Sequence, residues 1–177
     1  LPLLDDECRV MGVARLDDFV KEELLPIQAL IMAGGQGTRL RPLTDNLPKP
    51  LLPIGNQPLM EITVQKLKEA GIRRLSVAVH YKSDMIKAHF GDGQKYGIEI
   101  SYIDEEQPLG TAGALGIMPN PNETTLVVNG DILTQMDYRA MLIYHREHKA
   151  DMTVAVHRLH RLRRQRVLRA DRAVRGG

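Results

Sequence analysis

From residue 27 onward, apolar and polar residues alternate in a pattern that predicts strands and helices in turn. Short apolar runs are typical of buried strands, and apolar residues repeated every three or four positions predict amphipathic helices. The predicted strands are 27–32, 75–79, 98–103, 124–128 and 152–156, and the predicted helices are 58–70, 83–90, 111–118 and 137–149. Strands alternating with helices indicate an α/β fold with a doubly wound, mostly parallel, Rossmann-like sheet.

The first predicted strand runs into a glycine-rich loop that is suited to phosphates. Gly34, Gly35 and Gly37 lack the side chains that would keep a polyphosphate away from backbone N–H groups. A helix beginning after them would add its free N–H groups to the same site. Arg39 offers a planar guanidinium to phosphate oxygens, and Lys49 offers a point charge. The loop therefore predicts a triphosphate site.

Two better-known glycine loops do not fit this stretch. The dinucleotide fingerprint G-x-G-x-x-G lacks its third glycine, because Leu40 stands in that place. The P-loop needs a lysine directly after its last glycine, and Thr38 stands there instead. The alternative is a strand-to-helix turn that needs glycine only for its conformation. Lys49, which lies between two prolines further along the chain, argues against that alternative.

Residues 34–44 and 48–50 together resemble the signature of the sugar-1-phosphate nucleotidyltransferases, also called NDP-sugar pyrophosphorylases. That signature is G-G-x-G-T-R-L-x-P-L-T followed by P-K-P, and the resemblance runs from about residue 27 to about residue 156. It implies the nucleotide-diphospho-sugar transferase type of sheet, and a reaction of a nucleoside triphosphate with a sugar 1-phosphate that releases pyrophosphate. It also implies two catalytic residues, Arg39 and Lys49, and five that bind nucleotide: Ala33, Gly34, Gly35, Gly37 and Thr38.

A second motif, Asn129-Gly130-Asp131, follows the strand predicted at 124–128. It places a carboxylate at the carboxyl end of a buried strand, on the same rim as the glycine loop. Carboxylates suit Mg²⁺, which one or two of them usually hold together with substrate phosphates. The family resemblance implies that Asp131 is catalytic and binds the metal, and that Asn129 and Gly130 contact the nucleotide. An Asx-type turn after the strand is the alternative.

Residues 105–113 resemble the family's E-x-P-L-G-T-A-G segment, which surrounds the nucleobase. The resemblance implies nucleotide contacts by Glu105, Gly110 and Thr111. Glycines there let a flat base approach the backbone, and a carboxylate at Glu105 can accept hydrogen bonds from imino and amino groups such as those of guanine. Solvated loop charges are the alternative for Glu105. The dipeptide at 80–81 ends its strand on the same rim and is a candidate for the lining of the base pocket.

Both ends of the chain depart from the pattern, so we expect three parts: 1–25, 26–156 and 157–177. Residues 1–25 resemble the last strand pair and helix of a CBS repeat, expected as a remnant, and a simple hairpin is the alternative. Residues 157–177 contain eight arginines and one acidic residue, which predicts a disordered tail. The family's sugar-contacting segment is not recognisable after Val156. We therefore expect a truncated or frame-disrupted member that lacks the C-terminal part of the fold.

Composition narrows the class of protein. The 177 residues are 43% hydrophobic, which is enough for one domain with a core. There is no apolar run long enough to span a membrane and no recognisable signal peptide. The single cysteine, Cys8, excludes a disulfide framework and fits a reducing compartment, so we expect the cytoplasm. Nucleic-acid binding is not expected, because no aromatic residue interleaves with the arginines of the tail.

The expected function is Mg²⁺-dependent transfer of a nucleoside monophosphate to a sugar 1-phosphate. Such catalysis rests on positioning and electrostatics, and needs no nucleophilic side chain. The alternative is a nucleotide-binding fragment without catalysis, with a regulatory or assembly role. The expected partners are the triphosphate and the sugar 1-phosphate, and a homo-oligomer is considered as well. The sequence leaves the base and the sugar open.

Overall fold

The structure of the protein is a computed structural model that describes residues 2–13, 25–105, 107, 110, 113–120 and 122–156. The helix expected before residue 25, the nucleotide contact expected at Thr111 and the arginine-rich tail lie outside the described residues. The chain divides into two compact units, Leu1–Arg139 and Ala140–Gly177.

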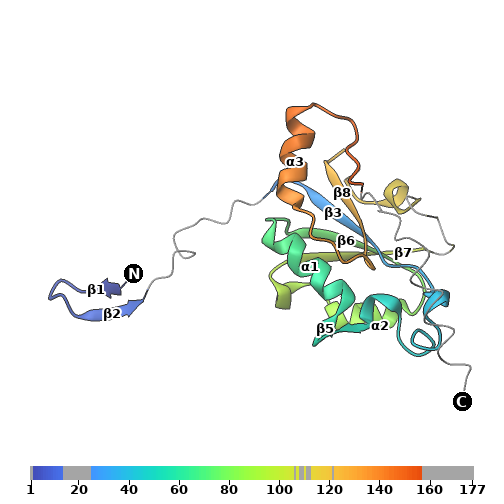
Figure 1. Ribbon diagram of the computed structural model, residues 1–177, viewed down its shortest axis with the longest axis horizontal. Coiled ribbons are helices and arrows are strands. Elements are labelled where there is room, and N and C mark those ends of the chain that lie inside the picture. The colour runs from blue at the N-terminus through green and yellow to red at the C-terminus, as the bar shows by residue number, and fades with distance from the viewer. Residues whose placement is uncertain are drawn as a thin grey trace, which may run out of the picture. The chain divides into compact units, whose positions relative to one another are not determined.

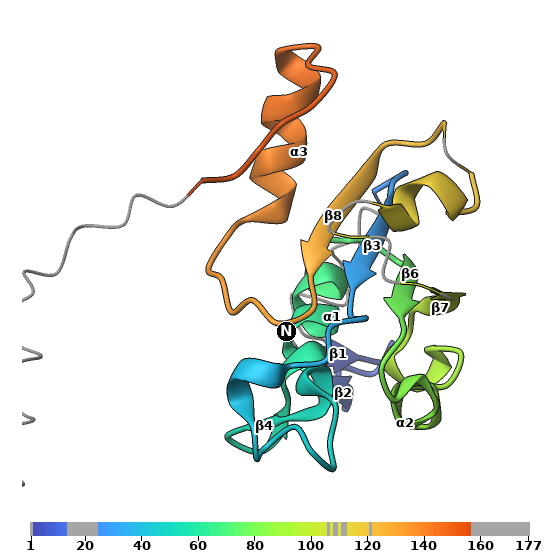
Figure 2. The ribbon, with the colours of Figure 1, turned by 90° about the vertical axis from the view of Figure 1, so that its right-hand side faces the viewer.

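A four-stranded parallel sheet is the centre of the first unit (Figures 1 and 2). Its strands are β3 (Gln28–Met32), β6 (Arg74–Val79), β7 (Glu99–Asp104) and β8 (Thr125–Asn129). Their order in space is β7-β6-β3-β8, so the chain builds outward from β3 first on one side and then on the other. The pairing is in parallel register throughout. The predicted α/β class with a doubly wound parallel sheet is confirmed.

Burial follows the position of each strand in the sheet. The central strand β3 has Leu30 and Ile31 fully buried, and its neighbour β6 is buried from Leu75 to its end. The edge strand β7 instead alternates, with Ile100 and Ile103 buried and the residues between them more exposed. Continuous apolar runs therefore mark the inner strands, as expected for strands covered on both faces.

Two helices make the crossovers between the first three parallel strands. Helix α1 (Leu59–Glu69) leads from β3 to β6, and helix α2 (Ser83–Phe90) leads from β6 to β7. In α1 the buried side chains Met60, Val64 and Leu67 recur at the spacing of one helix face. Short elements complete this unit: the pair β4 (Pro53–Ile54) and β5 (Gln57–Pro58), and the 3₁₀ turns η2 (Thr38–Leu40), η3 (Lys49–Leu51), η4 (Gln94–Tyr96) and η5 (Gly113–Ile117).

Three predicted elements differ from the structure. No α-helix follows the glycine loop, only the turn η2, because Pro42 disfavours helical backbone at Arg41 (φ −58°, ψ 140°). The helix predicted at 111–118 is the 3₁₀ turn η5 where it is described, and Gly113 and Gly116 lower its helix propensity. The strand predicted at 152–156 is wrong, because no described strand pairs with these residues.

The predicted strand pair near the N-terminus is confirmed. Strands β1 (Pro2–Leu4) and β2 (Val10–Val13) are antiparallel, and Asp5 Oδ1 accepts hydrogen bonds from the backbone N–H groups of Glu7 and Arg9 in the turn. Helix α3 (Tyr138–Glu147) occupies most of the helix predicted at 137–149. Within the described residues, every helix is too short or too polar to cross a membrane.

Candidate functional site

The loops after β3, β6, β7 and β8 all leave the sheet at its carboxyl edge, as they must in a parallel sheet. Hydrogen bonds continue the ladders one residue beyond the strands: Gly130 N donates to Met32 O (2.9 Å), and Glu105 N donates to Val79 O (2.9 Å). These bonds fix where each loop begins. The structure therefore brings the glycine loop, the residues after β6, the start of the base segment and the Asp131 motif to one edge of the sheet.

Gly37 is required by both conformation and space. Its φ of 64° lies in the left-handed region, and a Cβ on it would lie 2.8 Å from Cγ2 of Thr44. The buried Thr44 hydroxyl donates to Gly37 O (2.9 Å) and closes the loop. Thr44 was part of the recognised signature, but only the structure shows that its hydroxyl closes the loop by a hydrogen bond to Gly37.

The glycine loop and the base segment touch each other. A Cβ on Gly34 would lie 3.2 Å from Glu105 Oε2 and 3.3 Å from His80 Cβ. His80 Nδ1 lies 2.7 Å from the backbone oxygen of Glu105 and is hydrogen-bonded to it. A Cβ on Gly35, in contrast, would meet no described residue within 4 Å. Packing therefore explains the glycine at 34, whereas Gly35 faces open space on the rim.

Glu105 carries an unusual carboxylate. The residue is 8% exposed, and its Oε1 has no hydrogen-bond partner among the described residues. A buried carboxylate oxygen without a donor is unfavourable, so such an atom marks a place where a ligand can supply one. The alternative of a solvated loop charge is wrong for Glu105.

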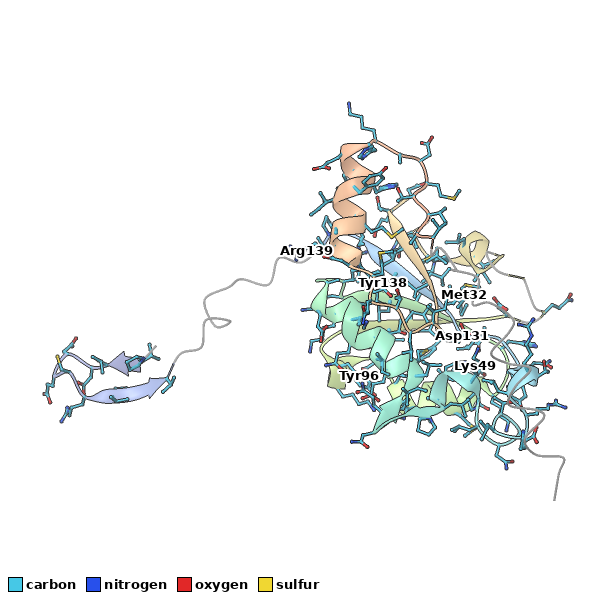
Figure 3. The ribbon with its side chains drawn as sticks, in the orientation of Figure 1. Met32, Lys49, Tyr96, Asp131, Tyr138 and Arg139 are labelled. Carbon is cyan, nitrogen blue, oxygen red and sulfur yellow. The ribbon has the colours of Figure 1, made fainter. Side chains whose placement is uncertain are left out.

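The two predicted cationic residues differ in their surroundings. Arg39, in η2, is exposed and has no ion-pair partner in the described part of the chain. Lys49, at the start of η3, forms an ion pair through Nζ with Oδ2 of Asp131, and Figure 3 shows the two side chains meeting. The structure thus joins Lys49 to the predicted metal-binding carboxylate, although 82 positions separate them in the sequence.

The segment after β6 is hydrogen-bonded to the loop that carries Arg39. Tyr81 Oη donates to Thr44 O (3.3 Å), and Lys82 Nζ donates to Asp45 O (2.6 Å). Lys82 has a left-handed φ of 51°. Residues 80–81 were predicted only as a lining for the base, Lys82 was not predicted at all, and no sequence signal indicated that Tyr81 and Lys82 contact the loop.

The remaining predicted residues lie at the same edge of the sheet, and their side chains make no hydrogen bond or ion pair within the described part of the chain. Ala33 is buried next to β3, and Thr38 and Asn129 are exposed at the rim. Gly110 has a left-handed φ of 78°. Their predicted contacts with nucleotide stay predictions.

The donor set around Asp131 determines which kind of metal site is feasible. Among the described residues, no group of three or more His, Cys, Asp or Glu side chains is placed to hold a metal ion. Asp131 offers one carboxylate that is 39% exposed. This fits Mg²⁺ held partly by substrate phosphates and does not fit a closed cage of protein ligands.

The first unit also has a cavity of about 310 Å³ that belongs to another part of the surface. It lies between the C-terminal half of α1 and residues 136–139, and its lining includes Lys66, Glu69 and Tyr138. Burial raises the pKa of Tyr138 there. None of the predicted site residues that the structure describes lines this cavity, so it is separate from the candidate site at the carboxyl edge of the sheet.

Comparisons with known proteins agree with this geometry. Residues 28–166 match the family model described as nucleotidyl transferase. The chain is 38% identical over 135 residues to mannose-1-phosphate guanylyltransferase of Mycobacterium tuberculosis, covering 75% of this chain and 38% of the relative. It is also 38% identical over 132 residues to D-glycero-alpha-D-manno-heptose 1-phosphate guanylyltransferase of Aneurinibacillus thermoaerophilus, covering 73% and 57%.

A solved structure supports the same relationship. It is a Bacillus anthracis protein, provisionally identified as a glucose-1-phosphate thymidylyltransferase, in complex with a sucrose. The TM-score is 0.64 at 30% sequence identity, with 69% of this chain and 51% of the other covered. The chain spans about two fifths to three fifths of the length of the two curated relatives. The predicted family is confirmed: the chain belongs to the sugar-1-phosphate nucleotidyltransferases.

Proposed function

We propose that the protein transfers a guanylyl group from GTP to a sugar 1-phosphate, with Mg²⁺ and with release of pyrophosphate. One observation carries the proposal: the glycine loop, the Lys49–Asp131 pair and the buried Glu105 carboxylate lie along one edge of the sheet. Ligands in such sheets bind beyond the carboxyl ends of the strands.

The phosphate part of the site supports the transfer step. A phosphate oxygen of the sugar 1-phosphate attacks the α-phosphorus of GTP, the bond from that phosphorus to the β-phosphate oxygen breaks, and pyrophosphate leaves. The glycine loop offers backbone N–H groups, and Arg39 offers a guanidinium without a partner among the described residues. Lys49 adds an ammonium group on the same edge. Such charges stabilise the negative charge that develops on transferring phosphates.

The base part of the site supports guanine. Guanine presents an imino and an amino donor side by side, and a carboxylate can accept both hydrogen bonds. Glu105 Oε1 lacks a donor among the described residues, and Oε2 faces Gly34. Thymine offers one imino donor between two carbonyl groups, so it would leave this carboxylate poorly matched. Both curated relatives reported above are guanylyltransferases.

The metal part of the site supports Mg²⁺. Asp131 supplies one carboxylate, and the triphosphate would supply the other charged ligands. A divalent cation in this place polarises the phosphoryl group and orients it for attack. For the sugar, we propose a hexose or heptose 1-phosphate, on the basis of the two curated relatives.

Nucleotide binding without transfer is the second candidate. Every residue predicted to contact triphosphate, base or metal lies before residue 132, and binding requires only this set. Transfer also requires that the sugar 1-phosphate be held in line with the α-phosphorus, and losing that orientation can lower a rate by many powers of ten.

Pyrophosphate release and calorimetry together separate these candidates. The full chain is assayed with GTP or dTTP, mannose 1-phosphate or glucose 1-phosphate, and Mg²⁺ or a chelator. Release from GTP that requires Mg²⁺ and is lost in Asp131→Asn supports transfer, because this substitution removes the charge that would hold the metal. GTP binding without release supports the second candidate. Absence of GTP binding contradicts the first candidate, and absence of binding by both nucleotides contradicts the second as well.

A further inference from the structure

Lys49 and Asp131 neutralise each other in the protein without ligands. Lys49 Nζ contacts Oδ2 of Asp131, and the two side chains are 29% and 39% exposed. Within the described residues, Lys49 is the only ion-pair partner of Asp131. The ammonium group therefore lies on the same carboxylate that the proposed function gives to a divalent cation.

The backbones on both sides of this pair are fixed by packing. Pro48, Pro50 and Leu51 are buried around Lys49. A Cβ on Gly130, next to Asp131, would lie 3.1 Å from Ile31 Cγ2, which shows how closely that residue packs on β3. The freedom in this part of the site therefore belongs to the Lys49 side chain, whose four-carbon stem can swing.

The positive charge of Lys49 affects how a metal ion can bind to Asp131. A cation approaching Asp131 in the absence of nucleotide must displace an ammonium group, or share the carboxylate with it, and like charges at contact repel. A triphosphate offers Lys49 another anion, which frees the carboxylate of Asp131. Lys49 then keeps a contact with an opposite charge, and the carboxylate of Asp131 becomes available to the metal.

We infer that Lys49 takes the place of the divalent cation on Asp131 in the nucleotide-free protein, so that the metal enters together with the triphosphate and not before it. The inference rests on the proposed function for the identity of the site. It concerns a different property, which is the affinity of the empty site for a metal ion. Arg39 has no such role, since it does not contact Asp131.

Mn²⁺ binding to nucleotide-free protein tests the inference. Free Mn²⁺ is measured by electron paramagnetic resonance during titration of wild type, Lys49→Met and Lys87→Met. Lys87 is the matched control because it is also about one third exposed and pairs with an aspartate, Asp104, at 2.6 Å. Lys49→Met should bind Mn²⁺ roughly two- to fivefold more tightly than wild type, the size expected for removing one partly exposed ionic partner. Lys87→Met should bind like wild type.

Further variants separate local from general effects. Asp131→Asn added to Lys49→Met should abolish the gain, and Lys49→Arg should keep the wild-type affinity because it keeps the charge. If Lys49→Met does not fold, Lys49→Gln makes the same test. An unchanged Mn²⁺ affinity in the folded variant, or an equal gain in Lys87→Met, overturns the inference. The measurement needs no turnover, so an absence of pyrophosphate release contradicts the proposed transfer and leaves this result standing.

Discussion

The polar groups at the two edges of the parallel sheet differ in how fully they are hydrogen-bonded or ion-paired. At the amino edge, both Nη atoms of Arg74 bind the carboxylate of Glu123 (3.1 and 2.6 Å), and Gln28 Nε2 donates to Asn120 O (2.9 Å). At the carboxyl edge, Arg39 and Glu105 Oε1 have no partner among the described residues. The same four strands thus carry a closed polar network at one end, whereas the other end combines the Lys49–Asp131 pair with polar groups that lack partners.

This difference separates stabilisation from binding. The Glu123–Arg74 hydrogen bond and charge lower the pKa of the Glu123 carboxyl and raise the pKa of Arg74, so both charges gain from folding. Arg74 and Glu123 already satisfy each other through two hydrogen bonds, so they have little to offer a ligand, whereas the Lys49–Asp131 pair is proposed to exchange partners with one. Groups left without partners at the carboxyl edge lower stability or contribute nothing to it, and they gain only when a ligand supplies the missing charge or donor.

The largest expected effect is at Gly37, where a substitution disrupts the folding of the glycine loop at the carboxyl edge. Gly37→Ala should lower the free energy of unfolding by about 2–4 kcal/mol, because it combines left-handed backbone strain with a contact that is too close. Gly55→Ala is the matched control: the φ of Gly55 is 63°, but an added Cβ would meet no described residue within 4 Å. It should lose only about 1 kcal/mol. Urea unfolding measures both, and equal losses would show that the contact with Thr44 is unimportant.

The next effect is on binding alone. Arg39→Ala should weaken triphosphate affinity by about 1.5–3 kcal/mol, the range for hydrogen bonds to a charged group, and should leave unfolding unchanged because Arg39 is exposed. Arg39→Lys should recover part of the affinity, since the charge remains and the planar fork is lost. Calorimetry with GTP and Mg²⁺ measures both variants. Full affinity in Arg39→Ala would remove this loop from the site.

The smallest effect is at the amino edge, and it depends on pH. Because the pKa of Glu123 lies below its ordinary value of 4.5 when folded, its contribution to stability is present above that pH and is lost as the pH falls through the lowered folded value. Arg74→Ala should remove this contribution, so variant and wild type should differ in stability at pH 7 and converge at the acidic end. GTP affinity at pH 7 should be unchanged. A weaker GTP affinity would mean that the two edges are not separate.

Local patterns in the sequence predicted the four strands of the parallel sheet, and with them the position of the glycine loop and of Asp131 at the carboxyl edge, because each depends on neighbouring residues. Contacts across the sheet were not predictable: Arg74 meets Glu123 and Lys49 meets Asp131 only after β3, β6 and β8 are aligned. The prediction of a helix after the glycine loop was wrong for a local reason. Pro42 disfavours helical backbone at Arg41, although parallel sheets of this kind commonly place a helix after the first strand.

The central claim is that the carboxyl edge recognises a guanine nucleotide, and calorimetric titration of wild type and Glu105→Gln with GTP and with dTTP tests it most directly. Wild type should bind GTP more tightly than dTTP. Glu105→Gln should lose about tenfold or more of that preference, because an uncharged amide replaces the carboxylate that accepts both guanine donors. Equal affinity of wild type for the two nucleotides, or an unchanged preference in Glu105→Gln, would contradict the account.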